Sequence, residues 1–256
     1  MKKLIRNTLL CVLLLLVLFV AGLAWTLRAT PPLSTYDLAA PASVPITDAT
    51  STILVFGATR NTGLMVARLL KARGDSVTAF VRPTSDVAAL IDSDIDRVVG
   101  DAMDLESVRA AFAGRDIAAV VTTIGCISCE PPSDYQGNAN VIRAAREAGV
   151  RRLVLVTTIG AGDSADAMPA LSARFLSRTL PLKTRAEEDL RASGLDYTIV
   201  RPGGLRSGQR TGNGVLSEDR AAFGFIFRAD LAELLVSVLD DPGTIGKTFA
   251  AVDANR

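Results

Sequence analysis

The chain has 256 residues, and its 28 basic and 27 acidic side chains leave a formal net charge of +1, which excludes the strongly basic surface that nucleic-acid binding requires. Nearly half of the residues are apolar, and a chain of this length holds one domain of ordinary size with a full core. Because the sequence contains no histidine and only three cysteines, it excludes His-based catalytic triads, disulfide-rich scaffolds and the usual metal sites.

The first 28 residues contain a long apolar run. No charged residue stands between Arg6 and Arg28, and the stretch is long enough to cross a hydrocarbon core of about 30 Å as a helix. The run exceeds the apolar part of a usual signal peptide, and no clear small-residue cleavage site follows it. Residues 1–28 are therefore predicted to be an uncleaved transmembrane anchor, with a cleaved signal peptide as the alternative.

Residues 29–51 are predicted to be a linker. They include four prolines among small and polar residues, a composition typical of an extended tether outside a packed core. The folded domain is predicted to span residues 52–256.

Strands and helices are predicted to alternate from Ile53 onward. The apolar strand "TILVF" leads into a helix that ends at Gly74, and "SVTAFVR" follows as a second strand. Then come the strand "DRVVG", the helix "DLESVRAAFAG", the strand "IAAVVTTIG", the helix "NANVIRAAREAG" and the strand "RRLVLVTTIG". Strands that read as continuous apolar runs indicate a parallel sheet covered by helices on both faces. We therefore expect a Rossmann-type doubly wound α/β domain.

Ligands of such sheets bind beyond the carboxyl ends of the strands, so the turn after the first strand is the first candidate site. Gly57 permits a sharp turn, Gly63 permits close packing of helix on sheet, and the intervening amides face a pyrophosphate at the helix N-terminus. The spacing of these glycines is a weak signal alone, and a turn without a ligand is the alternative. The predicted cofactor-binding residues of this turn are Gly57, Ala58, Thr59, Arg60, Asn61, Thr62 and Gly63.

Several ordered motifs resemble one known family. They are "GATRNTG", "VRP" after the second strand, "GDAMD" after the third, "AAREAGVRRLVLVTTIGAG" around the fifth, and "KTRAEEDLRASGLDYTIVRPGGL". The chain from about Thr52 to its end is similar to the atypical short-chain dehydrogenases/reductases, specifically their NmrA-like and flavin/biliverdin-reductase-like members. This resemblance implies a Rossmann fold, an NAD(P) cofactor and an oxidoreductase activity.

Arg60 and Arg82 bear on the choice of cofactor. The family turn usually reads G-x-x-G-x-x-G, and Arg60 replaces its middle glycine, while Arg82 stands where an NAD-specific protein carries an acid. Two guanidinium groups without an acid favour a 2′-phosphate, and therefore NADP(H), with NADPH preferred over NADH. The alternative is that both are solvated surface charges.

The resemblance implies further contacts at the strand ends. Asp101 and Ala102 would lie beside the adenine, and Pro202 and Gly203 would close over the nicotinamide. The residues that would line the ribose and nicotinamide side are Thr122, Thr123, Ile124, Gly125 and Thr157.

Catalysis is predicted to involve Thr158 and Lys183. Classical relatives use a Y-x-x-x-K pair in which the lysine lowers the tyrosine pKa, but Thr179 stands at the tyrosine position here. Thr158 keeps a hydroxyl that could polarise a carbonyl. By resemblance, Lys183 would bind the nicotinamide ribose, and a plain surface pair with Glu187 is the alternative.

Cys126 and Cys129 form a C-x-x-C just past the fourth strand. Two incidental loop cysteines are the first interpretation, and a small disulfide is expected if the domain faces an oxidising compartment. The stretch from Gly203 to Phe227 combines several glycines with few core residues and is expected to form a mobile flap beside the site.

The leading hypothesis is an NADP(H)-dependent oxidoreductase that passes hydride to a small conjugated acceptor such as a quinone or flavin. The missing tyrosine supports a non-catalytic NADP(H)-binding sensor, and the anchor supports a membrane-tethered assembly factor with a protein partner. Lys2, Lys3 and Arg6 before the apolar run place the domain outside the cytoplasm by the positive-inside rule, whereas the cofactor favours a cytoplasmic domain. We expect a single-pass membrane protein whose orientation is open, with the cytoplasmic side favoured for the domain.

Overall fold

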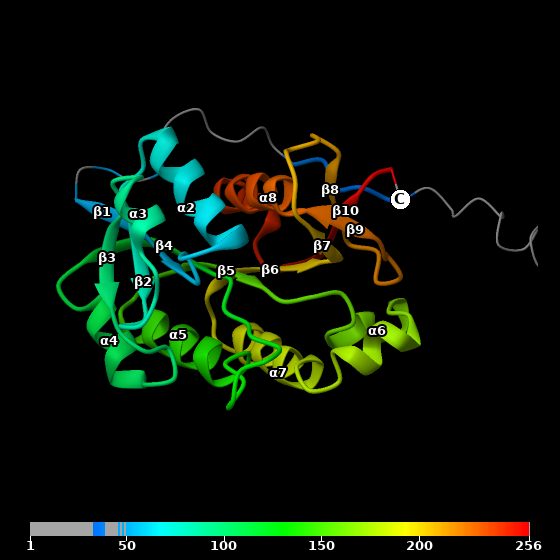
Figure 1. The fold of residues 1–256 in the computed structure, drawn as a ribbon, viewed down its shortest axis with the longest axis horizontal. Helices are drawn as coiled ribbons and strands as arrows, with labels where there is room; N and C mark the ends of the chain where they lie inside the picture. The colour runs from blue at the N-terminus through cyan, green and yellow to red at the C-terminus, as the bar shows by residue number, and fades with distance from the viewer. Residues whose placement is uncertain (1–32, 39–45, 47, 49, 256) are drawn as a thin grey trace, which may run out of the picture. The chain divides into compact units, whose positions relative to one another are not determined.

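The structure, a computed structural model, describes residues 33–38, 46, 48 and 50–255, and the part from Ser34 onward forms one compact unit (Figure 1). The predicted transmembrane anchor, residues 1–28, lies outside the described residues. Within the described ranges, every helix is too short or too polar to span a bilayer.

An eight-stranded sheet forms the centre of the domain, in the order β3-β2-β1-β4-β5-β6-β10-β8. All neighbouring pairs are parallel except β10 and β8, which are antiparallel. Its strands are β1 (Ser51–Phe56), β2 (Val77–Val81), β3 (Asp96–Val99), β4 (Asp116–Thr122), β5 (Arg152–Val156), β6 (Asp196–Pro202), β8 (Gly214–Ser217) and β10 (Lys247–Asp253). This order confirms the predicted Rossmann fold, and the strand order reverses between β1 and β4.

Helices cover both faces of the sheet (Figure 1). Helices α2 and α8 pack together on one face, and α4, α5 and α7 form a row on the other. The helices are α2 (Asn61–Arg73), α3 (Ala88–Ile91), α4 (Leu105–Phe112), α5 (Gln136–Glu147), α6 (Ala170–Phe175), α7 (Leu180–Arg191) and α8 (Arg228–Asp240). Gly74 ends α2 in the left-handed conformation with φ 100°, as predicted.

The alternation of side chains along β1 explains why this sheet needs helices on both sides. Ile53 and Val55 pack into the core shared with α2 and α8, whereas Leu54 and Phe56 pack into the core shared with α4, α5 and α7. All four side chains are fully buried. A strand with both faces buried must read as a continuous apolar run.

The stretch from Gly203 to Phe227 contains more structure than the flap expected from its glycines. It forms β8 and a separate parallel pair, β7 (Gly204–Arg206) with β9 (Phe225–Phe227). The buried Asp230 carboxylate accepts hydrogen bonds from the Thr211 amide at 3.0 Å and the Gly212 amide at 2.7 Å. These long-range contacts hold the loop, and no local sequence pattern indicates them.

Part of the predicted linker packs on the domain. The Tyr36 amide donates to the Leu216 carbonyl at 2.8 Å, and the Tyr36 and Phe249 rings lie 4.9 Å apart. The Ser217 hydroxyl donates to the Ser34 carbonyl at 2.5 Å. The prediction of a tether is therefore wrong for residues 34–38, because an aromatic side chain within it finds an apolar partner on the last parallel strand.

Candidate cofactor and active site

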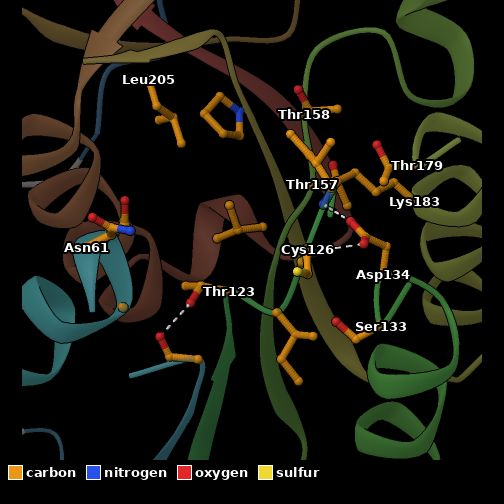
Figure 2. A pocket seen from close by; sticks show the side chains of 18 of the residues that line it. Asn61, Thr123, Cys126, Ser133, Asp134, Thr157, Thr158, Thr179, Lys183 and Leu205 are labelled. Atoms are coloured by element: carbon orange, nitrogen blue, oxygen red, sulfur yellow. Dashed lines mark hydrogen bonds and ion pairs between the residues drawn. The ribbon is translucent and has the colours of Figure 1, made fainter. Parts of the chain in front are cut away.

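A cleft of about 1270 Å³ opens beyond the carboxyl ends of β1, β2, β4, β5 and β6. It is larger than the roughly 300–1,000 Å³ of sites for drug-sized ligands, so a dinucleotide and a second reactant have room together. Figure 2 shows its side chains converging from the β1–α2 turn on one side and from α7 on the other.

The turn after β1 is built for close approach of a ligand to the backbone. Gly57 has φ +83°, and a Cβ there would lie 2.5 Å from the Thr123 hydroxyl oxygen. A Cβ on Gly63 would run into the carbonyl oxygen of Gly57. The Thr123 hydroxyl donates to the carbonyls of Phe56 and Gly57 at 3.2 and 3.3 Å, which joins the ends of β1 and β4 at the switch point.

The first turn of α2 has unused hydrogen-bond donors. Its amides have no acceptor within the helix, the Arg60 side chain provides no cap, and the turn contains no acid. The buried Thr62 hydroxyl has no hydrogen-bond partner among the described residues, although it lines the cleft. A pyrophosphate would satisfy these groups and complement the helix dipole. The turn therefore fits the phosphates of a dinucleotide.

Arg60 replaces a glycine without backbone strain. Its φ is −157°, an extended conformation open to any residue. The non-glycine residue of the turn with a positive φ is Asn61, at 51°, and asparagine tolerates that region better than most side chains. The Arg60 side chain is exposed and lines the cleft, so the arginine is compatible with an open turn.

The guanidinium groups of Arg60 and Arg82 are both available to a ligand. Each side chain is exposed and lines the cleft, and neither makes an ion pair in the described part of the chain. Arg60 before α2 and Arg82 after β2 are cations without carboxylate partners among the described residues, and together they favour binding of an added anion.

The structure brings nearly all the predicted site residues into one cleft. Those that line it are Gly57, Thr59, Arg60, Asn61, Thr62, Gly63, Arg82, Asp101, Ala102, Thr123, Ile124, Gly125, Thr157, Thr158, Lys183, Pro202 and Gly203. The exceptions are Ala58 and Thr122, which are fully buried. The Thr122 hydroxyl donates to the Asn138 side chain at 2.6 Å, so its predicted cofactor contact is not available.

Thr157 lines the cleft, but its hydroxyl is hydrogen-bonded within a buried ionic network. It donates to Glu187 at 2.7 Å, and the same carboxylate accepts hydrogen bonds from Arg201 at 2.9 and 2.6 Å. Burial alone would lower the pKa of Arg201, but the hydrogen bonds to Glu187 and Asp163 raise it above its usual value. The Thr157 hydroxyl is therefore already engaged and is not free for the polar cofactor contact predicted for it.

Lys183 forms a different ion pair from the one that sequence spacing suggested. Its ammonium lies 2.9 Å from the Asp134 carboxylate, and the two side chains are 12% and 1% exposed (Figure 2). The surface pair between Lys183 and Glu187 is wrong, because Glu187 points into the core toward Arg201. Lys183 instead lines the cleft beside Asp134.

Comparison with known proteins agrees with this geometry. Residues 57–242 match the NAD(P)H-binding family. A Bacillus subtilis protein described as an uncharacterized sugar epimerase is 30% identical over 204 residues, which cover 77% of this chain and 92% of that protein. A structure of an anaerobillin reductase from Escherichia coli O157:H7 has 30% identity and a TM-score of 0.72 and covers 80% of this chain and 97% of that one.

The chain belongs to the NAD(P)H-binding family. A further family relative is an NAD(P)H azoreductase of Xenophilus azovorans, 30% identical over 151 residues, which are 59% of this chain and 47% of that protein. These relatives support an NAD(P)H-dependent oxidoreductase of the atypical short-chain type.

The hydroxyls that line the cleft with Lys183 depart from the classical pattern. Thr179, at the tyrosine position, is buried, and its hydroxyl lies 3.3 Å from the Leu176 carbonyl. The Thr158 hydroxyl makes no hydrogen bond within the described residues and lines the cleft. Of the two threonines, only Thr158 therefore has a hydroxyl available to a reactant.

Sequence reasoning missed two features of the site. Asp134 gave no signal, because it is a single carboxylate before a helix and its partner stands far along the chain. An apolar rim at the cleft was also missed; we define it as Ile127, Leu171, Phe175, Leu205 and Phe225. The structure also joins Cys126 and Cys129 in a disulfide, the alternative that the sequence left open.

Proposed function

We propose that this chain is an NADP(H)-dependent oxidoreductase that passes hydride to a small conjugated acceptor with apolar character, such as a quinone or flavin. The observation that carries the proposal is one continuous cleft whose lining includes both an apolar rim and two arginines that make no ion pair in the described part of the chain. Lys183 and Thr158 line the cleft as well. Relatives named as reductases give further support.

The residues of the cleft have separate roles in binding the cofactor and in the reaction. Bound NADPH supplies the hydride. Arg60 and Arg82 bind the 2′-phosphate, and the α2 turn holds the pyrophosphate. Lys183 orients the nicotinamide ribose. The Thr158 hydroxyl donates a hydrogen bond to the acceptor oxygen that gains negative charge, and a quinone then needs one further proton from solvent to become a hydroquinone.

The apolar rim supports the choice of acceptor. Leu171 and Phe175 are 82% and 71% exposed, and helix α6, which carries both, contains no buried residue. Leu205 and Phe225 are also exposed and line the same cleft. Exposed apolar side chains grouped at a cleft are typical of a binding surface for an apolar ligand.

The first experiment follows NADPH oxidation by the full-length chain with quinones of increasing apolar character. We expect turnover with the apolar members, and we expect Leu171→Ser with Phe175→Ser to raise their KM about ten-fold, because the ligand loses apolar contact area. The matched control is Ile91→Ser, which removes an apolar side chain 55% exposed and outside the cleft. An equal KM in the rim variant and the control would rule out the rim as the acceptor site.

A non-catalytic NADP(H)-binding sensor is the second candidate. The observation that favours it is the buried Thr179 in place of the tyrosine, which leaves no phenol at this position. Tight NADPH binding without turnover of any quinone, flavin or azo compound would favour the sensor over the enzyme. Cofactor-dependent capture of a protein partner would then distinguish the sensor from an assembly factor.

We also propose that residues 1–28 anchor the protein in a membrane by a single pass, on the support of the uncharged run between Arg6 and Arg28. For the side of the folded domain, the cofactor favours the cytoplasm, whereas the Cys126–Cys129 disulfide favours an oxidising compartment. The full-length chain is expected to stay with membranes after an alkaline carbonate wash. Release into the wash would contradict the anchor, and digestion of the domain by protease added outside intact cells would place it on the oxidising side that the disulfide favours.

A further inference from the structure

The Asp134 carboxylate occupies an unusual position at the nicotinamide end of the cleft. It stands two residues before α5, between the end of β4 and helix α7, and its side chain is only 1% exposed. A buried carboxylate is costly unless each oxygen has a partner. The partners of Asp134 therefore indicate what the fold uses it for.

Each oxygen of this carboxylate has a different partner (Figure 2). Oδ2 accepts a hydrogen bond from the Cys126 amide at 3.0 Å, and Oδ1 lies 2.9 Å from the Lys183 ammonium. The Asp134 carbonyl also accepts a hydrogen bond from the Asn138 side chain at 2.8 Å. Backbone and side chain are thus both fixed, so the carboxylate is a rigid support.

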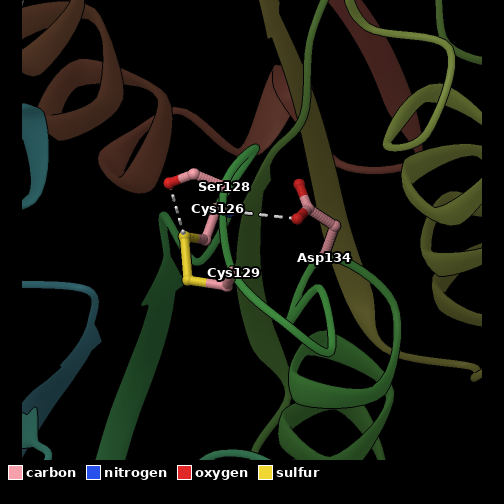
Figure 3. The surroundings of a disulfide bond; sticks show 4 residues. All are labelled: Cys126, Ser128, Cys129 and Asp134. Atoms are coloured by element: carbon pink, nitrogen blue, oxygen red, sulfur yellow. Dashed lines mark hydrogen bonds between the residues drawn. A yellow bond between two sulfur atoms is a disulfide. The ribbon is translucent and has the colours of Figure 1, made fainter.

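The loop that supplies the Cys126 amide is itself closed. The disulfide between Cys126 and Cys129 links its two ends, whose Cα atoms are 5.4 Å apart (Figure 3). A closed loop limits the directions that its amide can take. The Cys126 amide therefore holds Asp134 in a defined direction toward Lys183.

The Gly125 position leaves room for this arrangement. A Cβ on Gly125 would lie 2.9 Å from the Lys183 ammonium and 3.0 Å from Asp134 Oδ1. The ion pair thus lies directly against the backbone that follows β4, which lines the cleft. Lys183 is 12% exposed, so its ammonium stays accessible from the cleft.

We propose that Asp134 is a positioning residue, which holds the Lys183 ammonium where the nicotinamide ribose binds. The ion pair with Asp134 fixes the place of the ammonium, whose N–H donors then face the ribose hydroxyls. A lysine side chain otherwise loses rotamer freedom on binding, and the fixed carboxylate removes that cost in advance. This inference rests on the proposed function, because it assumes that the cleft binds NADPH.

The test compares two ligands that reach different parts of the cleft. NADPH spans its whole length, whereas 2′,5′-ADP contains only the adenosine end of the cofactor. In the full-length chain, Asp134→Asn is expected to weaken NADPH binding about ten-fold and to leave 2′,5′-ADP binding unchanged, because only the nicotinamide end loses an oriented donor. A merely structural role of Asp134 would affect both ligands alike, so loss of both would overturn the proposal.

A double-mutant cycle keeps the test decisive if the single variant is unstable. Lys183→Met is expected to lose the same affinity for NADPH, and Asp134→Asn with Lys183→Met is expected to lose no more than Lys183→Met alone. The double variant also removes both charges, so it leaves no unpaired carboxylate in the interior. Additive losses would show that Asp134 acts independently of Lys183 and would overturn the proposal.

A matched control uses an ion pair outside the cleft. Asp94 pairs with Lys71 at 3.1 Å, and Asp94→Asn removes one carboxylate in the same way. Its left-handed backbone, with φ 51°, accepts asparagine. The control should bind both ligands as the wild type does. Failure of the wild type to bind NADPH would overturn the proposed function itself, whereas normal wild-type binding with an unchanged Asp134→Asn would overturn only this inference.

Discussion

Replacement of Glu187 by glutamine is expected to lower the free energy of unfolding by about 3–5 kcal/mol, the cost of leaving a buried charge without its partner. Glu187 is fully buried and accepts hydrogen bonds from Arg201 and Thr157, while Arg191 approaches it at 3.1 Å. Glutamine keeps the shape of the glutamate side chain. Its NH2 group, however, is itself a donor, so it faces one of these donating groups without forming a hydrogen bond. The Arg201 guanidinium, buried to 4% side-chain exposure, then retains only the partly exposed Asp163.

The measurement is urea unfolding of Glu187→Gln beside Glu218→Gln. Glu218 also pairs with a cation, Lys247, at 3.0 Å, but its side chain is 55% exposed, so its loss should cost no more than about 1 kcal/mol. Equal unfolding midpoints for the two variants would contradict the buried network. Glu187→Leu combined with Arg201→Met should be more stable than Glu187→Gln, because it removes both buried charges.

Substitution of the two free arginines is expected to remove the preference for NADPH. Arg60→Gln and Arg82→Gln should each weaken NADPH binding about 10- to 100-fold, the range for loss of a hydrogen bond to a charged group, and should leave NADH binding nearly unchanged. The reason is that NADH has no 2′-phosphate for the guanidinium groups to bind. The fluorescence of the reduced nicotinamide measures both affinities in the full-length chain.

Arg97→Gln is the control for these variants. Arg97 is exposed on the edge strand β3 and does not line the cleft, so its removal changes net charge by the same amount without touching the site. A similar loss of NADPH affinity in Arg97→Gln would show that the loss comes from the change in net charge of the protein and not from contacts in the cleft. Equal affinity of the wild type for NADH and NADPH would refute the assignment of Arg60 and Arg82 to a 2′-phosphate.

The fold was predictable because its signals are local. Continuous apolar runs such as that from Ile53 to Phe56 identify strands buried on both faces, and Gly74 marks a helix end by its need for a positive φ. The cleft followed from the same reasoning, since the carboxyl ends of parallel strands meet at one edge. The smaller elements, α3, α6 and the β7–β9 pair, lack such signals because they have only three to six residues.

Within the site, the sequence identified residue types and positions but not partners. Lys183 was predicted as a site residue and lines the cleft, yet its spacing from Glu187 suggested a surface pair, and both side chains have other partners. Thr157 and Thr158 look equivalent in sequence, and the twist of the chain after β5 turns one hydroxyl to Glu187 and leaves the other beside the cleft.

The sequence by itself determined the order of strands and helices, the glycine turn and the two arginines, because each depends on a short run of neighbouring residues. Only the tertiary structure decided that Asp134 meets Lys183, that Tyr36 packs on Phe249 and that the apolar rim gathers at the cleft. These contacts join segments distant in the chain. Which residues meet depends on how the sheet and helices pack, and the order of residues along the chain does not show that packing.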